Sequence, residues 1–215
     1  MAEDSGLILA IGKWVLREAC TQTRIWLNEG LTLPKMAINC WAMEFRNEHF
    51  VENIFAVLRE VGLHPSMLEV ELTESILMRH AASSQSILTE LRSSGVQVAV
   101  DDFGTGYSRL SYLSKFPIDT LKIDQSFIRQ ITATPDDTAI VSAIIGMGRS
   151  MDLTVVAEGV GTQLEREFLE AHHCDEAQGY LYGRPMIAEE FAKLLASGIQ
   201  ETAPSQIPFA SASPA

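Results

Sequence analysis

Short apolar segments and longer amphipathic segments alternate along the chain. The short segments are rich in Val, Ile and Leu and predict strands at residues 36–39, 67–72, 96–100, 120–123, 153–157 and 177–179. The longer segments carry apolar residues three to four positions apart and predict helices at residues 7–28, 51–61, 84–91, 109–113, 137–151, 163–171 and 188–195. Regular alternation of this kind predicts an α/β fold, with a parallel sheet covered by helices.

The pattern continues without a linker from residue 1 to residue 198, which predicts one domain over residues 1–198. Residues 199–215 differ in composition, because ten of the fifteen residues from Glu201 to Ala215 are Ala, Pro or Ser. Such a segment buries too little apolar surface to offset the entropy lost on ordering. We therefore expect residues 199–215 to form a disordered Ala/Pro/Ser-rich tail.

Charge and cysteine content narrow the class of protein. The 215 residues include 28 acidic and 16 basic side chains, for a net charge of −12. This balance argues against binding of a nucleic-acid polymer, because such proteins neutralise phosphates with clustered Lys and Arg, but it allows a small phosphorylated ligand held through metal ions. The scattered cysteines Cys20, Cys40 and Cys174 are typical of reduced thiols. No segment approaches the ~20 apolar residues of a membrane helix, so we expect a cytoplasmic protein without a membrane segment.

Polar side chains follow nearly every predicted strand. They are Asn39, Glu71 with Glu74, Asp101 with Asp102, Lys122 with Asp124, Glu158, and Gln178. In a parallel α/β barrel the carboxyl ends of all strands meet at one face, where active sites are built. Packing does not require polar residues at these positions, so together they predict a functional site.

Some of these residues also have a structural interpretation. A single acid after a strand often caps the next helix, an alternative that stays open for Glu158 and is favoured for Asp124. Lys122 lies between two apolar residues of a short strand, so its side chain either points into the barrel or extends to solvent.

The adjacent acids Asp101 and Asp102 have no simple structural explanation. Neighbouring carboxylates at the end of an apolar strand repel each other unless cations are close. Gly104 and Gly106 follow directly and supply an adaptable loop. Carboxylate and amide oxygens are the ligands that hard divalent cations such as Mg²⁺ and Mn²⁺ prefer, so the pair predicts a metal site.

Taken in order, these motifs resemble the EAL family of bacterial cyclic-di-GMP phosphodiesterases. The matching stretches are Glu71-Leu72-Thr73-Glu74-Ser75, Asp101-Asp102-Phe103-Gly104-Thr105-Gly106-Tyr107-Ser108, Leu121-Lys122-Ile123-Asp124, Val156-Ala157-Glu158-Gly159-Val160, Gln178-Gly179-Tyr180 and Gly183-Arg184-Pro185. The resemblance covers roughly residues 2–195. It implies a TIM-type (β/α)₈ barrel that hydrolyses the second messenger cyclic-di-GMP to linear pGpG.

The resemblance also implies a pair of Mg²⁺ or Mn²⁺ ions and their ligands. Asn39, Glu71 and Asp101 are implied to bind one ion. Asp101 is implied to bridge to a second ion near Asp102, with Glu158 contributing directly or through water. Two such ions lower the pKa of a bound water and stabilise charge on the attacked phosphate.

Other residues receive catalytic or supporting roles from the same resemblance. The implied catalytic residues are Lys122, Glu158, Gln178 and Asp102, with Lys122 and Gln178 positioning the attacking water and the phosphate. The implied support for the substrate and the loop comes from Glu74, Thr105, Gly106 and Asp124.

The chain departs from the family pattern in three places. It has no Glu-Ala-Leu motif, so we expect an incomplete barrel that lacks its first one or two strands. The family's Asn-x-Ser-x-x-Gln stretch is Asn39-Cys40-Trp41-Ala42-Met43-Glu44 here, and Gly161 replaces a family Glu.

An open barrel leaves two unpaired strand edges, so a homodimer or strand-swapped oligomer is expected. The alternative function is a catalytically impaired module that binds cyclic-di-GMP or a protein partner in signalling.

Overall fold

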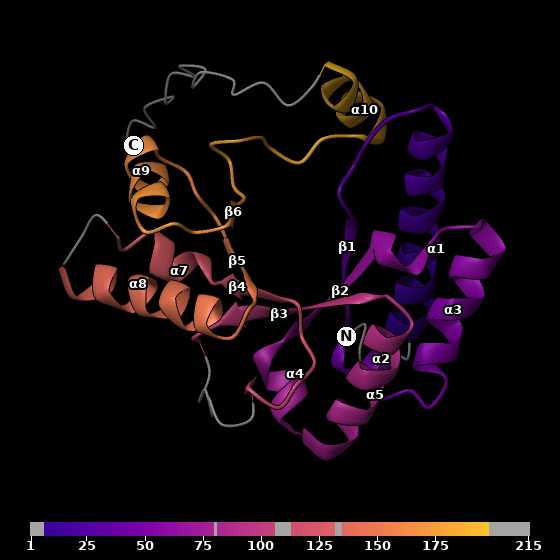
Figure 1. Cartoon of the computed structure of the whole chain (residues 1–215). Coiled ribbons are helices and arrows are strands. Elements are labelled where there is room, and N and C mark those ends of the chain that lie inside the picture. Colours follow the sequence, from indigo (N-terminus) through magenta and orange to yellow (C-terminus); the bar gives the residue numbers. More distant parts are fainter. Residues whose placement is uncertain (1–6, 80, 106–112, 132–134, 198–215) are drawn as a thin grey trace, which may run out of the picture.

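Six parallel strands form the centre of the molecule. The computed structural model describes residues 7–79, 81–105, 113–131 and 135–197. The strands are β1 (Met36–Asn39), β2 (Leu68–Thr73), β3 (Gln97–Phe103), β4 (Thr120–Ile123), β5 (Thr154–Ala157) and β6 (Glu176–Ala177). They lie side by side in chain order, and every neighbouring pair is parallel. The sheet curls without closing, which makes it an incomplete barrel of the TIM type (Figure 1).

Helices connect the strands and surround them (Figure 1). They are α1 (Leu7–Asn28), α2 (Ala42–Phe45), α3 (Phe50–Val61), the 3₁₀ helix η1 (Pro65–Met67), α4 (Glu74–Arg79), α5 (Ala81–Ser93), α7 (Gln125–Ile128), α8 (Pro135–Ser150), α9 (Gln163–Ala171) and α10 (Ala188–Ser197). Apolar strand residues such as Val70, Val98, Leu121 and Val155 are fully buried in one continuous core with apolar helix residues. This core holds the strands in place.

The other face of the sheet is polar. Side chains alternate between the two faces of a strand, and the strand register places Glu71 opposite Ala99 and Ala99 opposite Thr120. Residues two positions away on the same strands, such as Glu69 and Lys122, share this inner face. The curled sheet therefore presents a row of polar side chains toward its own interior.

Most predicted elements are confirmed. The predicted strands at 36–39 and 120–123 and the predicted helices at 7–28 and 163–171 match their observed bounds. The last predicted strand, at 177–179, was placed too late, since β6 comprises Glu176–Ala177. Three short helices were missed: α2, α4 and α7 have four, six and four residues, too few for a helical repeat to show. Residues 109–112 and the predicted tail at 199–215 lie outside the described residues.

A contact between two helices, α1 and α10, links the two edges of the sheet. Among the described residues, β1 and β6 each pair with one strand only. Helix α10 follows β6 and reaches α1 on the far side of β1, where the rings of Trp26 and Phe191 lie 5.2 Å apart (Figure 1). Within the described part of the chain, no helix is both long and apolar enough to span a membrane.

Candidate active site

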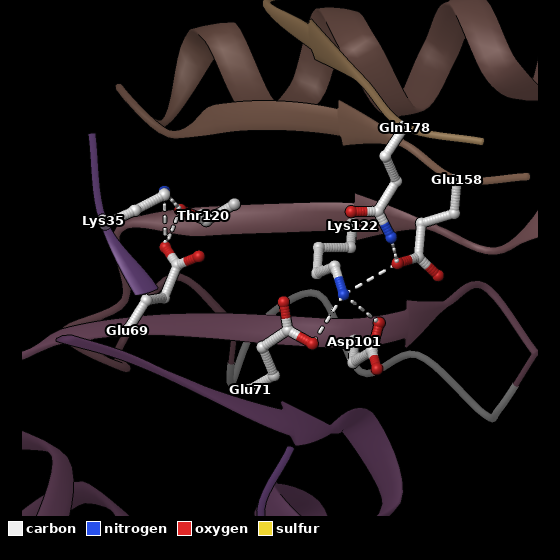
Figure 2. Close-up of polar contacts among 8 residues, drawn as sticks. All are labelled: Lys35, Glu69, Glu71, Asp101, Thr120, Lys122, Glu158 and Gln178. Atoms are coloured by element: carbon white, nitrogen blue, oxygen red, sulfur yellow. Dashed lines mark hydrogen bonds and ion pairs between the residues drawn. The ribbon is translucent and has the colours of Figure 1, made fainter. Parts of the chain in front are cut away.

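Lys122 is the centre of a cluster of carboxylates on the inner face of the sheet. Its Nζ lies 2.7 Å from Glu71 Oε2, 3.1 Å from Asp101 Oδ1 and 2.7 Å from Glu158 Oε1 (Figure 2). The side chain of Lys122 is only 5% exposed. Because its neighbours on β4 belong to the apolar core, the alternation of the strand turns Lys122 inward. Of the two directions that the sequence allowed, the structure shows the one into the barrel.

A bulge in β3 brings the adjacent acids Asp101 and Asp102 to the same site. These two residues of β3 stand opposite the single residue Lys122 of β4, which shifts the register. Asp102 takes the left-handed backbone conformation, with φ 52°. A regular strand would turn the two carboxylates to opposite faces, whereas here Asp101, Asp102 and Glu158 each place one oxygen within 4.8 Å of the others.

Glu158 and Gln178 extend the site across the ends of β5 and β6. The Glu158 N–H donates to Ile123 O at 3.1 Å, which continues the β4–β5 ladder beyond β5. Gln178 Nε2 donates to Glu158 Oε1 at 2.6 Å (Figure 2). The helix after β5 is capped by Thr162, whose side chain accepts from Glu165 N. The capping alternative for Glu158 is therefore wrong, and its carboxylate faces Lys122.

Asp124 and Thr105 stabilise the segments beside the site. Asp124 caps α7, since its Oδ1 accepts from Ser126 N at 2.9 Å, as the structural interpretation predicted. Its nearby carboxyl group also raises the pKa of Asp102, after the larger effects of burial and of Asp101. Thr105 Oγ1 donates to Asp102 O at 2.9 Å and fastens the turn after β3. Gly106, which was assigned to the same loop, lies outside the described residues.

Asn39 and Glu74 lie at the margin of the site. Asn39 ends β1 directly opposite Glu71 on β2, and its side chain is exposed. The Cys40 N–H donates to Glu71 O at 2.9 Å, which extends the β1–β2 ladder by one bond. Glu74 begins α4 with a buried side chain. The roles that the resemblance implies for Asn39 and Glu74 stay predictions.

The site carries more negative than positive charge. Burial raises the pKa of Glu71, Glu158 and Asp102, and the nearby charge of Asp101 raises each of them further. Burial alone would lower the pKa of Lys122, but the charges and hydrogen bonds of Glu71 and Glu158 hold it above its usual value. The charge of Lys122 thus balances only one of four carboxylates in a partly buried environment. These are the carboxylates of Glu71, Asp101, Asp102 and Glu158.

This donor set fits divalent cations. Asp101 Oδ1 is buried and receives no hydrogen bond, although it lies 3.1 Å from Lys122 Nζ in an ion pair. Such an oxygen retains the capacity to bind a cation. The surrounding donors are carboxylate and amide oxygens, which suit Mg²⁺ and Mn²⁺. The residues that could hold such ions are Asn39, Glu71, Asp101, Asp102 and Glu158.

A second polar cluster, which the sequence did not reveal, lies one layer below on the same face. It comprises Lys35, Glu69 and Thr120 and is named here the lower cluster. Lys35 Nζ and Thr120 Oγ1 each lie 2.7 Å from Glu69 Oε2 (Figure 2). The one available signal was spacing, because Glu69 and Thr120 precede Glu71 and Lys122 by two residues and must share their face.

Comparisons with known proteins place this chain in a family. The family model for the EAL domain matches residues 1–185. The bifunctional diguanylate cyclase/cyclic di-GMP phosphodiesterase MucR of Pseudomonas aeruginosa is 47% identical over 197 residues, which are 92% of this chain and 28% of MucR. Cyclic di-GMP phosphodiesterase NbdA of the same organism is 41% identical over 196 residues, which are 90% of this chain and 25% of NbdA. The chain thus spans about a quarter of the length of these curated relatives.

Solved structures agree with the sequence matches. The PaMucR phosphodiesterase in complex with c-di-GMP superposes with a TM-score of 0.86 and 47% identity, covering 88% of this chain and 77% of that chain. A manganese/c-di-GMP complex of Klebsiella pneumoniae BlrP1 superposes with a TM-score of 0.75 and 29% identity, covering 84% of this chain and 45% of that chain. The inward-facing Lys122, its carboxylate partners and the curled parallel sheet that carries them are accounted for by one conclusion: the chain belongs to the EAL domain family.

Proposed function

We propose that this chain hydrolyses one phosphodiester bond of cyclic-di-GMP and releases linear pGpG. The observation that carries the proposal is the buried Lys122 with its excess of carboxylates at the carboxyl ends of parallel strands. Relatives support the ligand, because PaMucR phosphodiesterase and BlrP1 are described as complexes with c-di-GMP. The manganese in the BlrP1 complex supports a metal-assisted reaction.

Two Mg²⁺ or Mn²⁺ ions are the proposed cofactors. Asn39, Glu71 and Asp101 would hold one ion, and Asp101, Asp102 and Glu158 the other. When bound, such ions lower the pKa of a coordinated water and neutralise charge on the attacked phosphate. The β3 bulge supports this assignment, because it directs the carboxylates of Asp101 and Asp102 to one place.

The side chains of this chain supply the remaining steps. The ammonium of Lys122 stabilises the charge that develops on the phosphate oxygens as water attacks phosphorus. The amide of Gln178, which is already fixed by its bond to Glu158, orients the water. Glu158, whose Oε1 lies 2.6 Å from Gln178 Nε2, is placed to accept the proton of that water. The ribose 3′-oxygen then leaves and takes up a proton from solvent, and Glu158 releases the proton that it accepted to solvent.

The direct test is formation of pGpG from cyclic-di-GMP by the full chain with Mg²⁺ or Mn²⁺, followed by chromatography. We expect Asp101→Asn to lower turnover by at least about 10²-fold, because it replaces a residue that would hold both proposed ions. Asp152→Asn is the matched control, since Asp152 is exposed and has the left-handed backbone that Asn tolerates. Equal turnover of Asp101→Asn and the wild type would contradict the assignment.

A second candidate function is that of a catalytically impaired module that binds cyclic-di-GMP or a protein partner. It is favoured by the exposed Gly161, which stands where the resemblance expects a Glu, and by the open sheet between β1 and β6. Calorimetry separates the two functions, because binding of cyclic-di-GMP without any pGpG supports the module. Hydrolysis by the wild type excludes it.

The proposed setting is the cytoplasm, with cyclic-di-GMP rather than a nucleic-acid polymer as the ligand. The net charge of −12 supports this choice of ligand.

A homodimer or strand-swapped oligomer is the proposed assembly, because an unpaired strand edge can accept a strand of another copy. Light scattering during size exclusion tests the assembly, and a monomer at all concentrations would contradict it.

A further inference from the structure

The lower cluster connects three separate segments of the chain. Lys35 directly precedes β1, Glu69 lies on β2 and Thr120 begins β4. Lys35 Nζ lies 2.7 Å from Glu69 Oε2 and 3.4 Å from Thr120 Oγ1, and Thr120 Oγ1 donates to Glu69 Oε2 at 2.7 Å. Glu69 is 3% exposed and Thr120 is 1% exposed. The carboxylate of Glu69 therefore joins β1, β2 and β4 from inside the sheet.

This cluster repeats the geometry of the candidate site one layer below it. Glu69 reaches Thr120 across β3, just as Glu71 reaches Lys122 two residues farther along the same strands. The β3 residue opposite both Glu71 and Thr120 is Ala99, whose single methyl group leaves room for side chains of β2 and β4 to meet. The contacts of both layers, Glu69 with Thr120 and Glu71 with Lys122, thus set the spacing between β2 and β4.

Strand β1 depends most on such an anchor. It has four residues, and in the described part of the chain its only strand partner is β2. The ion pair of Lys35 with Glu69 fastens its beginning, and the bond from Cys40 N to Glu71 O fastens its end. Asn39, a proposed metal ligand, lies between these two fixed points.

The lower cluster is built to hold strands together and not to bind a ligand. Its one carboxylate and one ammonium balance each other, and the hydroxyl of Thr120 donates to the same carboxylate oxygen as Lys35. No excess charge is left to attract an ion. The candidate site has the opposite balance, with four carboxylates around Lys122.

We propose that Lys35, Glu69 and Thr120 form a positioning cluster that holds β1 against β2 and β4 and thereby keeps Asn39 beside Glu71. The inference rests on the proposed function, because it assigns Asn39 a place in the metal site. Loss of the cluster frees the beginning of β1, so that Asn39 and Cys40 move away from Glu71 while β4 to β6 stay in place.

The cysteines of the chain allow a direct measurement of this movement. Cys40 is buried at the end of β1, and Cys174 is half-buried near β5, where its Sγ lies 3.4 Å from Val155 O. The test compares the wild type with Lys35→Met/Glu69→Gln, which removes both charges and leaves neither unpaired. Alkylation of each cysteine by N-ethylmaleimide is followed by peptide mass spectrometry at a temperature where both proteins are folded.

We expect Cys40 to be alkylated at least about 5-fold faster in the double variant, with Cys174 unchanged, because only the β1 edge opens. Binding of Mn²⁺, measured by electron paramagnetic resonance, should weaken by about 10-fold. Lys35→Arg keeps the positive charge beside Glu69, so Cys40 alkylation and Mn²⁺ binding should both equal those of the wild type. The matched control is Arg17→Met/Glu60→Gln, which removes an ion pair on the outside between α1 and α3 and should change neither value.

Each outcome decides the proposal. Equal acceleration of Cys40 and Cys174 would show a general loss of stability and would overturn it, as would unchanged Cys40 alkylation. If the double variant does not fold, Thr120→Val keeps the ion pair and should accelerate Cys40 alone, by a smaller factor. If the wild type neither binds Mn²⁺ nor yields pGpG, the proposed function fails, while the Cys40 measurement still decides whether the cluster positions β1.

Discussion

Two polar clusters lie on the inner face of one sheet, and they differ in their balance of charges. The upper cluster comprises Glu71, Asp101, Asp102, Lys122 and Glu158, and the lower cluster comprises Lys35, Glu69 and Thr120. In the lower cluster one ammonium serves one carboxylate, whereas in the upper cluster one ammonium serves four. In both clusters a Glu of β2 contacts a residue of β4 across β3. Strand geometry alone therefore does not distinguish the two clusters.

The difference shows how a functional site can be recognised among buried charges. A balanced buried pair needs no further ligand, and replacing such a pair by apolar residues often costs little. In an unbalanced group the carboxylates repel one another, which raises their pKa values, and a cation that enters is bound favourably because it relieves this repulsion. The charge excess of the upper cluster, together with its burial, therefore supports the proposed metal-binding and catalytic role.

Removal of Lys122 should have the largest effect. In Lys122→Met the carboxylates of Glu71, Asp101 and Glu158 face one another without a cation, which should lower the free energy of unfolding of the metal-free protein by about 3–5 kcal/mol. Turnover of cyclic-di-GMP should fall by about 10³-fold, because a fixed charge at the phosphate is lost. Urea unfolding with and without Mn²⁺ and a turnover assay measure both effects.

The control for this substitution is Lys193→Met, since Lys193 is exposed on α10. It should leave stability and turnover unchanged. If Lys122→Met were as stable and as active as this control, the upper cluster would not depend on its central ammonium, and the contrast with the lower cluster would disappear.

A metal ion should stabilise the protein more at neutral pH than in acid. Burial raises the folded-state pKa of Glu71, Asp102 and Glu158, so folding takes up protons and the metal-free protein loses stability as pH rises through these values. At about pH 8 the ionised carboxylates should bind Mn²⁺, which adds about 2.7 kcal/mol at a concentration 100 times the Kd. At about pH 5, closer to the ordinary carboxyl pKa range, a larger share of these groups is protonated, so Mn²⁺ should bind more weakly.

Thermal unfolding at both pH values, with and without Mn²⁺, measures this difference. Asp101→Asn is the control, because it removes the proposed shared ligand and should abolish the stabilisation at either pH. Equal stabilisation of the wild type at both pH values would mean that the ion binds elsewhere than in the upper cluster.

Much of the sheet and of the upper cluster could be predicted from the sequence. The apolar strand residues alternate with polar ones, and parallel strands bring their carboxyl ends to one edge. This placed Glu71, Asp101, Lys122 and Glu158 at a common face, where the structure has them. The direction of Lys122 could not be predicted, because it depends on which face of β4 the apolar core covers.

Features that depend on contacts between distant segments could not be predicted. The bulge at Asp101 and Asp102 arises from the register of β3 on β4, which the sequence of β3 alone does not specify. The pairing of Lys35 with Glu69 joins residues 34 positions apart. A single Lys before a strand is ordinarily a surface residue, so nothing local indicated that this one reaches into the sheet.

Removal of Lys35 should have a smaller effect than removal of Lys122. Lys35→Met leaves the single carboxylate of Glu69 with the hydroxyl of Thr120, and the Lys35 side chain is 18% exposed, so water can reach the vacated position. We expect the free energy of unfolding to fall by about 2 kcal/mol. Urea unfolding measures it, and Arg17→Met on the outside of α1 is the control. A loss as large as that of Lys122→Met would contradict the balanced character of the lower cluster.

Removal of the Thr120 hydroxyl should have the smallest effect. Thr120→Val keeps the shape of the side chain and the ion pair between Lys35 and Glu69, so Glu69 loses one of its two partners and no charge becomes unpaired. We expect the free energy of unfolding to fall by about 1 kcal/mol, as for one hydrogen bond. Thr154→Val is the control, because Thr154 lies opposite Thr120 on β5 and is only half-buried. If Thr120→Val cost as much as Lys35→Met, the hydroxyl and not the ion pair would be the main support of Glu69, and the lower cluster would hold β2 to β4 without depending on β1.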